Sequence, residues 1–157
     1  MLLPFVGADT IEKALALYRR LHCRDLEKGV RILPGAKRLL QQLEKNGSVL
    51  AIASNRPRRF CRIILRVTGL RLFFDYMLCG DDVRHRKPHP QMLRAIMRRY
   101  HVLPEQVLYV GDMIIDIETG KRAGVRTVAV ASGSCRAAEL RRAMPYRLVK
   151  SLVGVKL

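Results

Sequence analysis

The sequence predicts an α/β domain, a doubly wound parallel sheet with helices packed on its faces. Three observations lead to this prediction. Helical and strand-like segments alternate from Pro34 onward, and the strand-like segments are short and apolar throughout, as in strands that helices cover on both sides. Polar residues directly follow several of these apolar segments, where the ligands of such sheets bind. With 157 residues, 49% of them hydrophobic, the chain can bury a core of its own.

The amino-terminal residues 1–33 are predicted to contain a helix of their own. Asp9 with Glu12 at the third helical position is typical of a capped helix start. Apolar residues then recur at helical spacing, at Ile11, Leu15, Tyr18 and Leu21. We therefore expect a helical region over residues 1–33, followed by an α/β core over residues 34–157.

Within the core, the order of helices and strands follows from the periodicity of apolar residues. Helices are predicted over 34–47, 57–70, 90–101, 116–124 and 135–144, and strands over 49–53, 76–79, 107–110 and 127–131. Glycines at 47, 69 and 124 are placed to end helices in the left-handed conformation. Prolines at 34, 57, 90 and 104 stand at or before the starts of elements.

The charge balance limits the choice of partners. The chain has 30 Lys and Arg against 13 Asp and Glu, a formal net charge of +17, which suits anionic partners such as nucleic acid, membrane surfaces or phosphorylated metabolites. The cations are spread along the whole chain, which favours a solvated basic surface over a dedicated nucleic-acid arm. Arg58, Arg62 and Arg66 form a predicted cationic ridge, and mutual repulsion of about 0.2–0.5 kcal/mol per pair does not forbid it. Nucleic-acid binding is therefore open but not favoured.

The cysteines and the apolar segments indicate a cytoplasmic protein. The four cysteines are widely separated, so neither a disulfide framework nor a zinc site is predicted. The apolar start MLLPFVGA lacks a basic region before it and is shorter than a signal core. No segment is long enough to span a membrane.

Polar side chains after three of the predicted strands form a candidate site. A serine hydroxyl with neighbouring backbone N–H groups, a lysine and two carboxylates on one rim can hold a phosphoryl group beside Mg²⁺. The residues are Ser54, Asn55 and Arg56 after the first strand, Lys87 after the second, and Asp112 and Asp116 after the third.

Each of these residues also has a purely structural explanation. Asp112 can close a Gly-Asp turn, Asp116 can cap the next helix, and Ser54 with Asn55 can form a turn before Pro57. These explanations do not predict that a hydroxyl, a lysine and an acid pair would each follow a separate buried strand, in this order. The joint pattern therefore favours a phosphoryl site.

Three segments, VLAIASNRP, GDDVRHRKPHP and VLYVGDMIIDIETGKRAG, resemble motifs two, three and four of the haloacid dehalogenase-like (HAD) superfamily, most closely its phosphoglycolate phosphatase-like branch. The resemblance extends over residues 34–150. It implies a Rossmann-like core, Mg²⁺ as cofactor, and hydrolysis of a small, phosphoglycolate-like phosphate monoester through an aspartyl-phosphate intermediate.

The resemblance also implies roles for the site residues. Ser54 and the Asn55 amide would bind the phosphoryl group, with Arg56 beside them on the substrate side. Lys87 would stabilise the charge of the phosphoryl group. Asp112 would ligate Mg²⁺, and Asp116 would support the metal shell or Lys87.

The first motif of this family has no counterpart in the sequence. The family carries its nucleophile in a DxDxT stretch after a first, central strand, and the nearest segment here, LLPFVGADT, has Gly7 where the nucleophile should stand. By resemblance, residues 1–33 look like a remnant of a helical cap, and the strand expected between 49–53 and 107–110 is missing. That strand could lie upstream, in another molecule or nowhere. We expect residues 1–157 alone to have negligible phosphatase activity.

Two alternative functions remain open from the sequence. A metal-independent haloacid dehalogenase would leave the pair Asp112 and Asp116 without a use. A non-catalytic HAD-like protein that binds anions or nucleic acid would use the basic surface instead. Neither the substrate nor the oligomeric state can be read from the residues.

Overall fold

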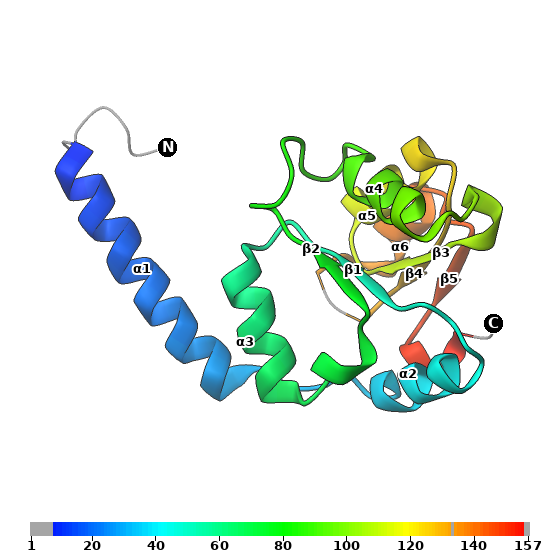
Figure 1. The fold of residues 1–157 in the computed structure, drawn as a ribbon, viewed down its shortest axis with the longest axis horizontal. Coiled ribbons are helices and arrows are strands. Elements are labelled where there is room, and N and C mark those ends of the chain that lie inside the picture. The colour runs from blue at the N-terminus through cyan, green and yellow to red at the C-terminus, as the bar shows by residue number, and fades with distance from the viewer. Residues whose placement is uncertain (1–7, 133, 156–157) are drawn as a thin grey trace.

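The computed structural model describes residues 8–132 and 134–155 and shows helices and strands in alternation from α2 onward (Figure 1). The helices are α1 (Ala8–Gly29), α2 (Ala36–Lys45), α3 (Arg58–Thr68), α4 (Gln91–Tyr100), α5 (Ile114–Ala123) and α6 (Ala137–Arg142). The strands are β1 (Ala51–Ala53), β2 (Tyr76–Leu78), β3 (Leu108–Gly111), β4 (Arg126–Val130) and β5 (Arg147–Val149). Short 3₁₀ helices are η1 (Arg71–Phe73), η2 (Pro104–Gln106) and η3 (Leu152–Gly154). The predicted α/β architecture is confirmed.

All strand pairs among the described residues are parallel. β1 pairs with β2, with Ala51 opposite Tyr76, while β4 lies between β3 and β5. Parallel neighbours need a long crossover connection. Here α3 connects β1 to β2, α5 connects β3 to β4, and α6 connects β4 to β5.

The five strands form two separate sheets. Within the described residues no hydrogen-bonded ladder joins β1 to β3, the strands through which the two sheets would have to meet. Both strands instead pack on α4, whose Leu93 and Met97 lie in one cluster with Ala53 of β1 and Tyr109 of β3. The interruption falls between the two strands, β1 and β3, that by the family resemblance would lie on either side of the missing central strand.

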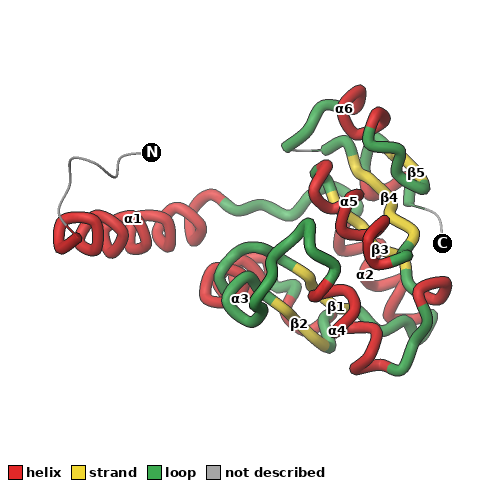
Figure 2. Tube along the Cα trace, turned by 90° about the horizontal axis from the view of Figure 1, so that it is seen from above, coloured by secondary structure: helices red, strands yellow, loops and turns green. Residues whose placement is uncertain are grey.

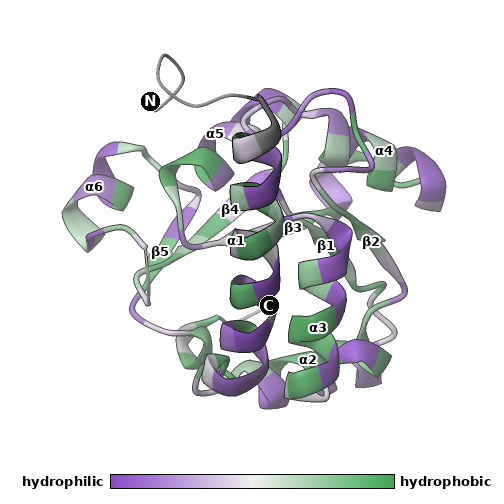
Figure 3. Cartoon of the chain, turned by 90° about the vertical axis from the view of Figure 1, so that its left-hand side faces the viewer, coloured by the Kyte–Doolittle hydropathy of each residue, from purple (hydrophilic) through white to green (hydrophobic). Residues whose placement is uncertain are grey.

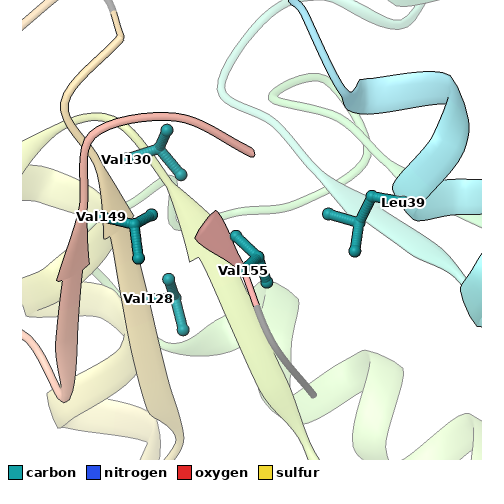
Figure 4. Packing of buried hydrophobic residues seen from close by; sticks show 5 residues of the cluster. All are labelled: Leu39, Val128, Val130, Val149 and Val155. Atoms are coloured by element: carbon teal, nitrogen blue, oxygen red, sulfur yellow. The ribbon is translucent and has the colours of Figure 1, made fainter. Parts of the chain in front are cut away.

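Helices cover both faces of the three-stranded sheet. Residues of β4 and β5 pack against α2 on one face (Figure 4), in a buried cluster of Leu39, Val128, Val130, Val149 and Val155. Ala129, between Val128 and Val130, points to the opposite face and packs against Ile117 of α5 and Leu140 of α6. Successive residues of a strand face opposite sides, so this alternation accounts for the uninterrupted apolar residues 128–130 of β4.

The predicted helix ends are largely confirmed. Gly47, Gly69 and Gly124 have φ of 71°, 67° and 74°, the left-handed conformation expected of residues that end a helix. Pro57 and Pro90 directly precede α3 and α4. Strand β5 was not predicted, because its three residues, which begin with an arginine, carry too little apolar pattern to be recognised.

Helix α1 extends away from the rest of the molecule and packs on α3 near its carboxyl end (Figures 1 and 2). Leu26 is buried there, and the His22 ring meets the Phe60 ring edge-on at 4.7 Å. Figure 3 shows hydrophobic and hydrophilic segments alternating along α1. Toward the amino end of the helix, three side chains of the predicted apolar stripe are exposed, Leu15 at 44%, Tyr18 at 59% and Leu21 at 45%. The boundary between residues 1–33 and 34–157 stays a prediction.

Three other expectations concern individual features of the chain. The side chain of Asp9 lies outside the described residues, so its capping role stays a prediction. The four cysteines are free thiols. None of the described helices combines the length and apolar character needed to cross a membrane.

Candidate functional site

The side chain of Asn55 joins the loop after β1 to the loop after β2. Its Nδ2 donates to the carbonyl oxygen of Lys87 at 3.0 Å, and its Oδ1 accepts from the backbone N–H of Lys87 at 2.9 Å. The two hydrogen bonds fix the backbone of Lys87 beside the carboxyl end of β1. The prediction for Asn55 concerned only its backbone amide, and this positioning role was not foreseen.

The ammonium group of Lys87 is held in a buried polar cluster. Its Nζ donates to Asp116 Oδ1 at 2.7 Å and to the Tyr109 hydroxyl at 2.9 Å, and the Lys87 side chain is 11% exposed. The Tyr109 hydroxyl in turn donates to Asp116 Oδ1 at 2.9 Å. Burial, together with the charge of Asp116, raises the pKa of Tyr109, so its hydroxyl remains protonated and available as a donor.

Asp116 serves two elements at once. While Oδ1 holds Lys87 and Tyr109, Oδ2 accepts from the backbone N–H groups of Asp112 at 3.2 Å and Met113 at 3.1 Å. Met113 immediately precedes α5, so the carboxylate also satisfies donors at the helix start. The structural explanation, that Asp116 satisfies donors at the start of the next helix, is therefore confirmed, and its functional role stays a prediction. Four accepted bonds favour a role in holding Lys87 over direct metal ligation, which stays a prediction.

Two glycines allow the loops of the site to approach closely. A Cβ atom on Gly111, the last residue of β3, would lie 2.5 Å from Cγ and Oδ2 of Asp116. A Cβ on Gly80 would lie 2.9 Å from the carbonyl carbon of Asn55 and closer still to its oxygen. Real Cβ contacts are essentially never this short, so glycine is required at both positions for this arrangement.

Asp112 presents a carboxylate at the carboxyl end of β3. Its Oδ2 accepts from the Ser134 hydroxyl at 3.2 Å and the Ser134 N–H at 3.4 Å. Ser134 follows β4, the neighbouring strand, and was not singled out from the sequence. Mg²⁺ prefers hard oxygen ligands, takes one or two carboxylates and keeps several waters. The donor chemistry at Asp112 fits this ion.

Ser54 and Arg56 complete the rim beyond β1. The Ser54 Oγ accepts from the backbone N–H of Arg56 at 3.2 Å, which leaves its own hydrogen to be donated to an acceptor such as a phosphoryl oxygen. Arg56 is exposed, and the bonds that the described residues give it are made by its backbone, including one from Gly80 N–H to its carbonyl oxygen at 3.0 Å. The substrate-binding role of Arg56 stays a prediction.

A second acidic group, Asp81 and Asp82, lies nearby but serves helix α3. Asp81 accepts from the backbone N–H of Arg58 at 2.8 Å, and Asp82 pairs with the Arg58 guanidinium at 2.6 Å. Ligand atoms of Cys79, Asp81 and Asp82 lie within 4.8 Å of one another. Burial raises the pKa of the Cys79 thiol to about 12, so the free thiol is neutral. The two acids of this group anchor the start of α3 through Arg58.

The pairing of Asp82 with Arg58 predicts a pH-dependent contribution to stability. The hydrogen bond from Arg58 lowers the pKa of Asp82 below its ordinary value of 3.8. The stabilisation is therefore present above about pH 4 and is lost as the pH falls through the lowered pKa. We expect Asp82→Asn to reduce the free energy of unfolding by about 1 kcal/mol at about pH 7 and by much less at about pH 2. Urea unfolding at both pH values measures this, and an equal reduction at both would contradict it.

The chain is similar in sequence to proteins of a known hydrolase family. Residues 5–130, which include every predicted site residue, match the family model described as haloacid dehalogenase-like hydrolase. The chain is 33% identical to phosphoglycolate phosphatase 1 of Pseudomonas aeruginosa over 128 residues, 82% of this chain and 47% of that protein. It is 31% identical to pyrophosphatase PpaX of Bacillus mycoides over 140 residues, 82% of this chain and 65% of that protein.

A solved structure shows the same fold. The crystal structure of a predicted phosphoglycolate phosphatase from Haemophilus somnus superposes with a TM-score of 0.87 at 25% identity, over 94% of this chain and 65% of that one. The chain thus spans about half the length of the Pseudomonas aeruginosa relative, 47%, and about two thirds of the Haemophilus somnus structure, 65%.

Proposed function

Because this chain belongs to the haloacid dehalogenase-like hydrolase family, we propose that it supplies the phosphoryl- and Mg²⁺-holding part of a phosphatase for small phosphate monoesters. The observation that carries the proposal is the fixed position of Lys87 on the rim that also carries Ser54 and Asp112. Asp116 and Tyr109 hold its ammonium group, and Asn55 holds its backbone. A phosphoglycolate-like substrate is our proposal from the Pseudomonas aeruginosa relative.

The residues of the rim have complementary roles in this proposal. The Ser54 hydroxyl and the Asn55 backbone N–H donate to oxygens of the phosphoryl group, and the Lys87 ammonium neutralises charge on them. Asp116 and Tyr109 hold the Lys87 side chain, while Asn55 holds its backbone. Donors fixed before the reaction stabilise a developing charge without having to reorganise. Lys87 therefore needs no movement to act.

Asp112 is the residue that we propose as the Mg²⁺ ligand. The bonds from Ser134 to its Oδ2, and from its own backbone N–H to Asp116, orient its carboxylate. Bound Mg²⁺ would neutralise phosphoryl oxygens and help to position the substrate. The four free thiols suit a reducing compartment, and we propose a cytoplasmic location on that basis.

Covalent phosphoryl transfer also needs a nucleophile within reach of phosphorus. Neither acid of the described rim is proposed as this nucleophile. Asp116 already accepts four hydrogen bonds, and Asp112 is proposed as the metal ligand. We propose that the nucleophilic aspartate is carried by a strand that pairs between β1 and β3, supplied by preceding sequence or by a second polypeptide. The separation of β1 and β3 into two sheets supports this position.

The proposal is tested with a polypeptide in which a strand carrying DxDxT precedes residue 1. We expect it to hydrolyse p-nitrophenyl phosphate only with Mg²⁺, and Asp112→Asn to reduce turnover by about a hundredfold or more because the metal loses its charged ligand. Glu118→Gln removes a half-exposed acid from the same region and should leave turnover unchanged.

Three results would contradict parts of this proposal. Wild-type turnover by Asp112→Asn would remove Asp112 from the metal site. Full activity in excess EDTA would favour the metal-independent alternative. Robust activity of residues 1–157 alone that disappears with Asp9→Asn would show that the amino terminus itself supplies the nucleophile.

A further inference from the structure

We propose that a small phosphate-type anion binds in a second pocket, between α3 and the outer edge of β2. The hollow has a volume of ≈ 190 Å³, and its walls include Arg58, Arg62, Leu65, Arg71, Phe74 and Asp75. Pockets for drug-sized ligands measure about 300–1,000 Å³, so this one suits a smaller molecule. Neither the rim of the candidate active site nor the proposed phosphatase function accounts for it.

The pocket lies along the strand edge that does not face β1. The Leu78 carbonyl accepts from the backbone N–H of Ser54 and so points toward the loop after β1. The carbonyl of the preceding residue, Met77, points the other way and accepts from Arg58 Nη2 at 2.8 Å. Successive carbonyls of a strand alternate in direction, so Arg58 marks the outer edge of the sheet.

The arginines around the pocket differ in how many hydrogen bonds and ion pairs their guanidinium groups already make. Arg58 is bound to Asp82 and to Met77. Arg71 donates from Nη1 to the Phe74 carbonyl oxygen at 3.1 Å, which leaves its other guanidinium donors for a ligand. Within the part of the chain that the structure describes, Arg62 has no hydrogen bond or ion pair, although its charge helps to lower the pKa of Asp82.

Of the three arginines in the ridge on helix α3, Arg62 is the one whose guanidinium is not paired with an acid of the described chain. Its two neighbours on the ridge are neutralised, Arg58 by Asp82 and Arg66 by Glu27 at 2.7 Å. A guanidinium presents a planar fork of donors that matches phosphate and carboxylate oxygens. Arg62 and Arg71 together therefore offer two such forks to one hollow.

The remaining wall residues cancel only part of this charge. Among the described wall residues Asp75 is the one acid, so it offsets one of the two positive charges of Arg62 and Arg71, and its Oδ2 accepts from the backbone N–H of Leu50 at 2.8 Å. Leu65 is buried and Phe74 is partly buried, so they shield part of the hollow from water. Partial exclusion of water strengthens the attraction between a guanidinium and an anion. The pocket is thus cationic on one side and apolar on the other.

Two-dimensional ¹H–¹⁵N spectra of the chain titrated with inorganic phosphate at constant ionic strength test the proposal. We expect saturable shifts of the Nε–Hε signals of Arg62 and Arg71 and of the Met77 amide. Arg62→Gln and Arg71→Gln should each weaken this binding by about tenfold, because each removes charge-assisted hydrogen bonds. Arg98→Gln removes an exposed arginine outside the pocket and should not change it.

A parallel titration with glycerol 3-phosphate separates two sources of the phosphate group. If glycerol 3-phosphate binds more tightly than inorganic phosphate, the ligand is a phosphorylated metabolite whose organic part also contacts Leu65 and Phe74. If the two bind equally, the ligand is the free phosphate ion. Unmoved Arg62 and Arg71 signals, shifts reproduced by chloride, or equal weakening by Arg98→Gln would each overturn the proposal. Signals of Ser54, Asn55 and Lys87 report separately on the candidate active site, so either site can fail without the other.

Discussion

Replacing Asp116 by asparagine is expected to lower the free energy of unfolding by about 3–5 kcal/mol, because it leaves a buried ammonium without its counter-charge. The side chains of Lys87 and Asp116 are only 11% and 6% exposed. An asparagine has one oxygen in place of two, yet four donors converge on this carboxylate. In the asparagine, an NH₂ group would replace one carboxylate oxygen and would face N–H or O–H donors. Repulsion between these donors would add to the loss of the negative charge that pairs with Lys87.

Urea unfolding of the wild-type and variant chains measures this effect. For a chain of this length, a loss of 1 kcal/mol lowers the melting temperature by about 2–4 °C, so thermal unfolding should shift by about 6–20 °C. Glu118→Gln is the matched control, because Glu118 lies on the same helix and pairs with Arg122 at 3.8 Å with both side chains half exposed. Its effect should stay below about 0.5 kcal/mol.

A double variant identifies the cause of the loss. Lys87→Met combined with Asp116→Asn removes both charges, so the pair should cost clearly less than the sum of the two single changes. Additive costs would show that Lys87 and Asp116 do not depend on each other, and would contradict the account of Lys87 as a residue held in place by Asp116.

The local signals in the sequence predicted most of the fold. The helix ends at Gly69 and Gly124 depend on the left-handed conformation of a single residue, which glycine favours. The apolar residues 128–130 of β4 reflect burial on both faces of the sheet. Both causes leave a pattern that can be read in the sequence. The exposed stripe of α1 had a helical pattern too, but periodicity does not reveal whether a partner covers it. Strand β5 was missed because three residues are too few to show a period.

The sequence analysis named six residues of the candidate site but not the contacts among them, and it did not single out Tyr109 or Ser134. Asn55 and Lys87 are 32 positions apart, and nothing in either segment shows that a side-chain amide would bind a distant backbone. Tyr109 stands in an apolar run, so its pattern indicates only a core position and gives no sign of the hydroxyl bond to Asp116. Such contacts depend on the packing of several elements together, which a linear pattern does not contain.

Gly111→Ala should be strongly destabilising for so small a substitution, with a loss of about 2–4 kcal/mol in the free energy of unfolding. The added methyl would lie 2.5 Å from Cγ and Oδ2 of Asp116. Asp116 cannot turn away without releasing Lys87, Tyr109 or the start of α5, because its two oxygens hold all three. Either the clash remains or a buried hydrogen bond is broken, and both outcomes are costly.

Two comparisons separate this clash from a general effect of alanine on the chain. Gly29→Ala is the control, because nothing lies within 4 Å of the added atom, and it should change the free energy of unfolding by less than about 1 kcal/mol. Combining Gly111→Ala with Asp116→Gly removes the whole clashing side chain, including the Cβ atom that also lies against the added methyl, so the methyl should cost much less in that background than when Asp116 is present. If it costs the same in both backgrounds, the close approach of β3 to Asp116 is not what requires glycine at position 111, and the strain must arise from the strand itself.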